Sequence, residues 1–121
     1  MQDLTLETII AIHDGILAKD RGDSRVLSEG NLLQLVFRAN LTGDPLKRAA
    51  LVFYSLCAFP AFRTGNRRTA RRLAEAILVS DGHQVDIPCE ELLGLEQGID
   101  MFTFETDDVE QFLRQHIRKI S

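Results

Sequence analysis

The segment between Pro45 and Phe59 constrains the fold most, because it is apolar on nearly every side. Asp44 is suited to cap a helix there, and Pro45 fits the first helical position, where its missing N–H costs nothing. Pro60 disfavours helical geometry at the preceding residue and therefore ends the helix. Because a helix that is hydrophobic all round is buried, the rest of the chain is expected to pack around this one.

Apolar residues at helical spacing indicate five further short helices around the central one. They are expected to begin at Leu6, after Ser28 as N-cap, near Gly65 and Asn66, after Pro88, and after Thr106 as N-cap, the last with an apolar face reaching Ile120. Residues 83–87, HQVDI, alternate like a strand but are too few to define a sheet. The expected fold class is therefore all-α, a single compact domain of about six helices over residues 1–121.

Length and composition indicate the class of protein. A chain of 121 residues fits one domain, with a core large enough to fold without disulfides or a structural metal. Cys57 and Cys89 form no C-x-x-C pair, which favours a reducing compartment. No apolar run approaches the roughly 20 residues of a membrane span, and the N-terminus has acids where a signal peptide has basic residues. These features predict a soluble, cytoplasmic protein without membrane contact.

Basic residues are concentrated in one short stretch, although the net charge of the chain is −4. Residues 63–72 contain no acid and five of the fourteen cations, namely Arg63, Arg67, Arg68, Arg71 and Arg72. Because the rest of the chain is acidic and the stretch has no interleaved aromatic residues, nucleic-acid binding is disfavoured. A purely structural explanation is that Arg71 and Arg72 form surface salt bridges with Glu75, one helical turn further on.

The start of a predicted helix within this stretch favours a phosphate site. A helix N-terminus leaves about four backbone N–H groups unpaired and carries about half a positive charge. Gly65 at its entry lets a ligand approach closely, and Asn66 adds a side-chain donor. Arg68 and Arg71 lie on the same helix face, so their guanidinium groups are expected to converge. These four residues are the predicted phosphate-binding site, which contains no P-loop motif.

Several motifs occur in a distinctive order along the chain. L-T-x-E at the start and I-H-D in the first helix precede the apolar helix A-A-L-V-F-Y-S-L, which is followed by F-R-T-G-N-R-R-T-A-R-R. This order, which covers nearly the whole chain, resembles the Fic/Doc (death-on-curing) family. The resemblance implies that Phe62 packs the loop onto the core and that Gly65 and Asn66 form an anion hole. It also implies that Arg68 and Arg71 bind phosphate.

The same resemblance implies transfer of a nucleotidyl or phosphoryl group to a protein hydroxyl, from ATP or another nucleoside triphosphate with Mg²⁺. In the family, a histidine before the glycine acts as general base, and an acid next to the glycine holds the metal. Here these positions are Pro60, which has no ionisable group, and Thr64, whose neutral hydroxyl is a poor Mg²⁺ ligand. We therefore expect no catalytic residue of the family type, no metal cluster, and weak or absent transfer.

Two other features and one alternative function complete the sequence-based interpretation. His13 lies on the apolar stripe of the first helix and is interpreted as a packed, hydrogen-bonded core histidine. The loop from Arg38 to Pro45 matches in position the family's flap, a segment that holds a target peptide. The alternative is a non-catalytic binding or regulatory protein that engages a protein partner, such as an antitoxin-like chain, through the same face as the phosphate site.

Overall fold

The computed structural model describes residues 2–20 and 23–120. The elements follow one another in the order α1 (Leu6–Asp20), α2 (Glu29–Ala39), α3 (Pro45–Ala58), α4 (Asn66–Ser80), β1 (His83–Val85), α5 (Cys89–Asp100), α6 (Thr106–Gln115) and β2 (Ile117–Lys119). The described chain is therefore mostly helical, with six helices as the apolar spacing predicts, and it also contains a small two-stranded sheet. None of the helices in this part of the chain is long and apolar enough to cross a membrane.

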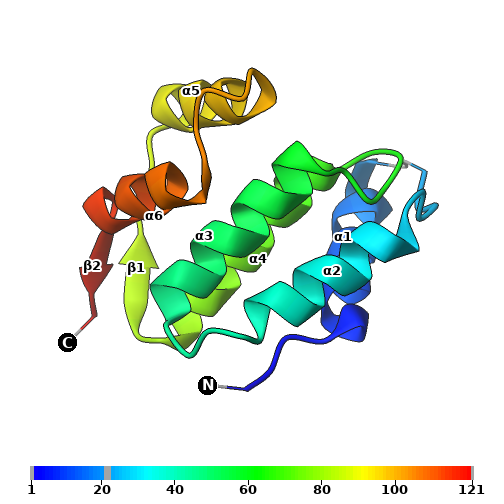
Figure 1. The fold of residues 1–121 in the computed structure, drawn as a ribbon, viewed down its shortest axis with the longest axis horizontal. Helices are drawn as coiled ribbons and strands as arrows, with labels where there is room; N and C mark the ends of the chain where they lie inside the picture. Colours follow the sequence, from blue (N-terminus) through cyan, green and yellow to red (C-terminus); the bar gives the residue numbers. More distant parts are fainter. Residues whose placement is uncertain (1, 21–22, 121) are drawn as a thin grey trace.

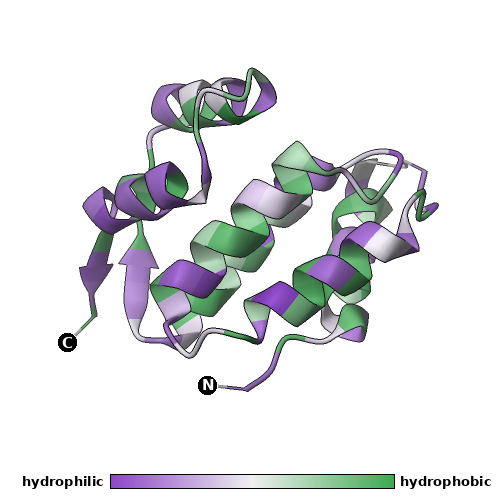
Figure 2. Ribbon diagram, viewed as in Figure 1, coloured by the Kyte–Doolittle hydropathy of each residue, from purple (hydrophilic) through white to green (hydrophobic). Residues whose placement is uncertain are grey.

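Helix α3 lies at the centre of the fold, which confirms the prediction made from its apolar sequence. It runs beside α4, with α1 and α2 on one side of the pair and α5, α6 and the two strands on the other (Figure 1). Asp44 caps α3 by accepting a 3.0 Å hydrogen bond from the backbone N–H of Leu46. Hydrophobic residues occur along most of the length of α3, whereas polar residues predominate in β1, β2 and much of α6 (Figure 2).

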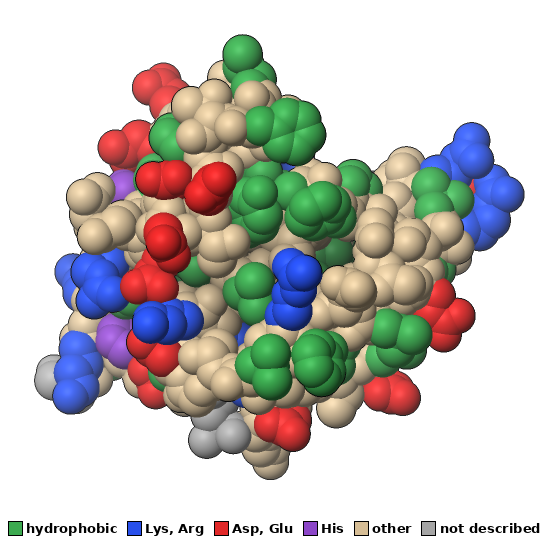
Figure 3. All heavy atoms as spheres, viewed as in Figure 1, with side chains coloured by type: hydrophobic (Ala, Val, Ile, Leu, Met, Phe, Trp, Pro, Cys, Tyr) green, Lys and Arg blue, Asp and Glu red, His purple; other side chains and the backbone are tan. Residues whose placement is uncertain are grey.

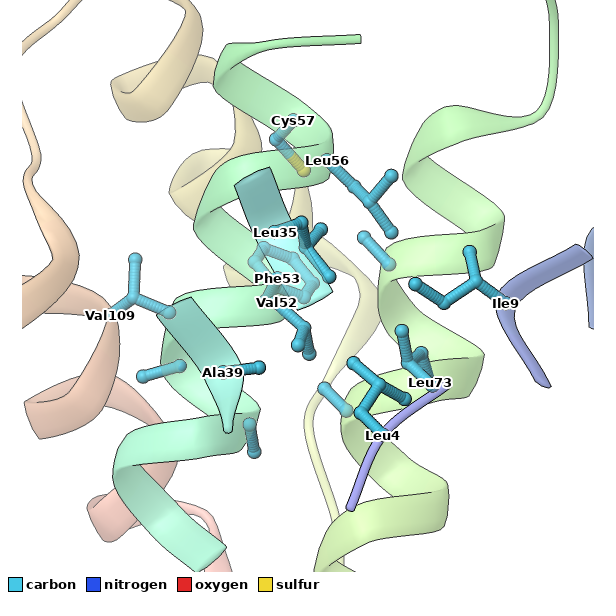
Figure 4. Packing of buried hydrophobic residues seen from close by; sticks show 14 of the residues in the cluster. Leu4, Ile9, Leu35, Ala39, Val52, Phe53, Leu56, Cys57, Leu73 and Val109 are labelled. Atoms are coloured by element: carbon cyan, nitrogen blue, oxygen red, sulfur yellow. The ribbon is translucent and has the colours of Figure 1, made fainter. Parts of the chain in front are cut away.

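The core is formed where α3 meets the helices around it. Phe53 is one of its largest buried side chains, and it belongs to a cluster that also contains residues of the N-terminal segment, α1, α2, α4 and α6 (Figure 4). The cluster includes Leu4, Ile9, Leu35, Leu73 and Val109. Truncation of a buried phenylalanine typically lowers the free energy of unfolding by about 3–5 kcal/mol. Packing of this size stabilises the contact between α3 and α4, next to the loop that joins them.

The C-terminal segment corrects two parts of the sequence-based prediction. Helix α6 ends at Gln115 instead of continuing to Ile120, and the residues that follow form β2. Strand β2 pairs antiparallel with β1, with Val85 opposite Ile117, so the short alternating segment does form a sheet. In a segment of three residues, the alternating pattern of a strand cannot be told apart from the apolar spacing of a helix. The strand with which it pairs is also distant in sequence, so no local pattern predicts the pairing.

The start of α6 is also displaced by one residue from the predicted cap. Thr106 is the first helical residue, and Glu105 is the N-cap. Glu105 and Asp108 form a capping box, in which the Glu105 backbone N–H donates to the Asp108 carboxylate at 2.8 Å. The reciprocal pair satisfies two helix-start N–H groups, whereas a threonine cap would satisfy one.

Candidate anion-binding groove

An open groove of about 520 Å³ lies where the end of α3, the start of α4 and one face of α5 meet. Its lining combines the end of α3 and the loop after it with most of the arginine stretch and with residues of α5. These residues are Cys57, Pro60, Arg63, Thr64, Gly65, Asn66, Arg67, Arg68, Arg71, Leu93, Glu96 and Asp100. The groove thus brings together all four residues predicted to bind phosphate. It also contains acidic residues that the sequence-based prediction did not include.

The loop before α4 is anchored from behind by Phe62 and His13. Phe62 is 1% exposed, and its ring stacks on the His13 imidazole with centroids 3.6 Å apart. His13 is fully buried, and its Nε2 donates to the backbone carbonyl of Thr64 at 2.7 Å. This arrangement agrees with the interpretation of His13 as a packed, hydrogen-bonded core histidine. It leaves His13 behind the loop, outside the lining of the groove.

The Asn66 side chain forms hydrogen bonds within its own loop. Its Oδ1 accepts hydrogen bonds from the backbone N–H groups of Ala61 and Phe62 at 3.1 and 3.0 Å. Its Nδ2 donates to the Phe62 carbonyl at 2.8 Å. The side chain therefore fixes the path of the loop, and the role of Asn66 as a donor to phosphate stays a prediction.

Gly65 directs the chain into α4. It is the N-cap, with a left-handed φ of +80° that favours glycine. A Cβ at this position would lie 3.3 Å from Leu17 Cδ2 and 3.4 Å from His13 Nε2, so the loop packs closely against α1. In the described structure α4 has no side-chain cap hydrogen bond, and the first bond within the helix runs from Thr69 N to Gly65 O. The N–H groups of the first turn are therefore available to an anion in the groove.

Two of the groove's arginines pair with acids on α5. The Arg71 guanidinium forms two hydrogen bonds with Glu96, at 2.9 Å from Nε and 2.5 Å from Nη2, and this bonding raises the pKa of Arg71. Glu96 is fully buried, and Arg67 forms an ion pair with Asp100. The predicted surface bridge from Arg71 to Glu75 is thus replaced by a partly buried one. A charge-assisted bidentate contact of this kind is stronger and fixes the geometry of the arginine.

The remaining arginines differ in their relation to the groove. Arg63 and Arg68 line it, whereas Arg72 is outside its lining. Arg63 also lies 3.4 Å from Asp23, which itself binds Arg25. The lining therefore contains four arginines and two acids, and the α4 N-terminus adds a partial positive charge to it.

The carboxylates that line the groove are engaged by its arginines, Glu96 by Arg71 and Asp100 by Arg67. Pro60 has no titratable group, and the Thr64 hydroxyl donates to the Asp23 carbonyl at 3.4 Å. Cys57 is buried, and burial followed by the charge of Glu96 raises the pKa of its thiol to about 12. The thiol is therefore protonated at neutral pH and unreactive. Among the described residues, no cluster of three metal-ligating side chains occurs.

The loop predicted to act as a flap lies away from the groove. Residues 40–44 join α2 to the start of α3, whereas the groove lies at the other end of that helix (Figure 1). At 1.5 Å per residue, α3 separates the two by about 20 Å. The Asn40 side chain also pairs with the Leu4 backbone, accepting from its N–H at 2.8 Å and donating to its carbonyl at 2.9 Å. The loop therefore does not line the groove, and its role as a flap that holds a target peptide stays a prediction.

Sequence reasoning missed the contribution of α5 to the groove. Glu96 and Asp100 are separated from the arginine stretch by β1 and by most of α5, so no local motif joins them. One signal was present, however. Glu96 occupies the same helical face as Leu92, Leu95 and Ile99, and a charged residue on an apolar face needs a buried partner.

The chain matches no family model, and no curated protein has significant sequence similarity to it.

Proposed function

We propose that the groove binds the phosphate chain of a nucleotide, and that the chain is a Fic/Doc-like binding domain with a degenerate catalytic motif. One observation carries this proposal: the uncapped N-terminus of α4 and four arginine side chains face the same groove of about 520 Å³. Backbone N–H groups and guanidinium groups are the donors that phosphate oxygens accept from best. ATP or another nucleoside triphosphate is the ligand class that we propose.

Binding would divide between the backbone and the arginine side chains. The N–H groups of Asn66 and Arg67 suit one phosphate group, because an anion at a helix N-terminus is stabilised by the dipole. Arg71 uses one N–H of Nε and one of Nη2 for Glu96, so the two N–H groups of Nη1 and the second of Nη2 are left for the ligand among the described contacts. Glu96 therefore orients Arg71 while lowering the net positive charge of the groove.

Efficient transfer is not part of the proposal, since the two carboxylates of the groove, Glu96 and Asp100, are engaged by Arg71 and Arg67. Pro60 has no proton acceptor, and Thr64 offers only a hydroxyl where Mg²⁺ binding calls for a carboxylate. The double variant Pro60→His, Thr64→Glu tests the comparison with Fic/Doc transferases. If the variant folds and labels proteins from radiolabelled ATP, and the wild type does not, the result would support a transferase whose activity was lost at these two positions. Failure of a folded variant to label would count against the family assignment.

The binding proposal is tested by calorimetric titration of ATP, with and without Mg²⁺, into a matched pair of variants. Arg68→Gln and Arg72→Gln remove the same charge from the same helix, but only Arg68 lines the groove. Loss of a charge-assisted hydrogen bond predicts about tenfold or more weaker ATP binding by Arg68→Gln. Arg72→Gln should bind within about threefold of the wild type, because Arg72 is exposed and makes no part of the groove lining. Equal loss in both variants would contradict the groove as the binding site.

A protein partner at the same face is the second candidate function. Leu93 is about half exposed and lines the groove together with Pro60 and Glu96, and Phe59, next to Pro60 in the chain, is also about half exposed. Further exposed hydrophobic side chains occur on the face of the molecule shown in Figure 3. Exposed apolar side chains next to a charged cleft are typical of protein interfaces. If millimolar ATP leaves the groove unperturbed, this second function replaces the first.

A further inference from the structure

Arg48 is a buried cation without a matching anion. Two charged side chains are buried in the described structure, Glu96 and Arg48, and only Glu96 has a partner of opposite charge. Arg48 is 4% exposed, and its guanidinium donates only to backbone carbonyls, those of Gln2, Ala39 and Thr42 at 2.7, 2.9 and 3.2 Å. Burial of an ion that lacks a counter-ion is costly, even where carbonyl oxygens satisfy part of its hydrogen bonding.

Arg48 also lines a cavity of about 260 Å³ between the N-terminal segment, α1 and the C-terminal half of α4. Most of the wall of this cavity is apolar. The rest consists of the hydroxyl groups of Thr8 and Ser80 and of the polar N-terminal residues Gln2 and Asp3. The lining residues are Gln2, Asp3, Leu4, Thr8, Ile12, Arg48, Leu73, Ala76, Ile77 and Ser80. The cavity therefore joins an apolar wall to a buried positive charge.

We propose that this cavity binds a small monocarboxylate with an apolar body, such as a branched aliphatic acid. A guanidinium has five N–H donors, and the three bonds to carbonyls leave two, which match the two oxygens of a carboxylate. The apolar part of the ligand contacts Ile12 and Ile77. An apolar cavity of about 150 Å³ already holds benzene, so this one accommodates the body of such an acid.

The charge around the cavity selects against ligands with more negative charge. Asp3 also lines it and is exposed, so a second negative charge at the mouth would be repelled. A phosphate chain therefore belongs in the groove at the start of α4, whereas this cavity adjoins Leu73 to Ser80 at the far end of the helix. The two proposals concern different residues, so an experiment that refutes one of them leaves the other unaffected.

The test compares 4-methylpentanoate with its neutral amide, which has the same shape, in an amide NMR titration of the wild-type protein. The carboxylate should give saturable shifts at Thr8, Ile12 and Ile77, with little change at Gly65. The neutral amide should bind about tenfold or more weakly, because it lacks the charge that Arg48 pairs with. Equal affinity of the two probes, or no saturable shift with the carboxylate, would overturn the proposal.

A matched pair of variants locates the site without removing Arg48, whose loss could unfold the chain. Ala76→Phe places a ring at the mouth of the cavity, whereas Ala11→Phe adds the same ring at an exposed position of α1 outside the cavity. Both alanines are exposed helical residues, so both variants should keep the wild-type circular dichroism. We expect Ala76→Phe to abolish 4-methylpentanoate binding and Ala11→Phe to leave it unchanged. Wild-type affinity in Ala76→Phe would overturn the assignment.

Discussion

Replacement of Gly65 by alanine tests the architecture of the groove, because Gly82 provides a control with the same backbone geometry. Both glycines have left-handed φ, +80° and +83°. A Cβ at Gly82 meets nothing within 4 Å, whereas one at Gly65 lies 3.3 Å from Leu17 and 3.4 Å from His13. The pair therefore separates the cost of the backbone conformation from the cost of crowding the loop against α1.

The expected magnitudes follow from these two environments. A left-handed alanine costs about 1–2 kcal/mol, and the reduced entropy of the unfolded chain returns about 0.4–1 kcal/mol. Gly82→Ala should thus lower the free energy of unfolding by about 1 kcal/mol. At Gly65, displacement of Leu17 and His13 adds about 1 kcal/mol, at the lower end of overpacking costs. Gly65→Ala should therefore lower the free energy of unfolding by about 2 kcal/mol.

Urea unfolding followed by circular dichroism measures both losses, and thermal unfolding checks them. A difference of about 1 kcal/mol between the variants corresponds to roughly 4 °C in Tm for a chain of this size. Gly65→Ala should also weaken ATP binding, since the new Cβ moves the start of α4, whereas Gly82→Ala should not. Equal destabilisation of the two variants would refute the close packing of the loop on His13 and Leu17.

Two further predictions concern α5 and the thiols. Gly94→Ala should raise the free energy of unfolding by up to about 1 kcal/mol, because the new Cβ enters open space in a helix. Gly98→Ala should lower the free energy of unfolding by about 1–3 kcal/mol, because the new Cβ clashes with the Phe104 ring. If urea unfolding gave both changes the same sign, this packing would be contradicted. Exposed Cys89 should react with a disulfide reagent at pH 8 while buried Cys57 resists until the protein unfolds. Burial raises the pKa of the Cys57 thiol from about 9 in the unfolded chain to about 12 in the folded protein. The thiol therefore contributes to stability below pH 9, and this contribution is lost as the pH rises above 9. Cys57→Ala should thus make the free energy of unfolding fall less steeply at alkaline pH.

Helix starts with a local chemical signal were predictable from the sequence. Ser28 accepts a hydrogen bond from Asn31 N at 3.1 Å, and Asp44 caps α3, both as their positions before apolar runs indicate. The end of α6 was not predictable in this way. Ile117 fits the apolar spacing of a helix, and only its pairing with β1, which follows α4, places it in a strand.

The candidate site shows the same division between local and tertiary information. Gly65 at the start of α4 and the arginines behind it follow from the sequence, because a left-handed glycine and a basic first turn are local features. The orientation of Arg71 depends on Glu96, which reaches it from another helix. The use of the Asn66 side chain within its own loop likewise depends on the loop's folded path.

Amide NMR spectra recorded during titration with ATP test the central claim most directly, because they report on each backbone N–H of the first turn of α4. The account predicts saturable shifts centred on Gly65, Asn66 and Arg67, with little change at the cavity beside Arg48. Shifts spread evenly over exposed cations, or the absence of shifts at millimolar ATP, would contradict phosphate binding at this helix start.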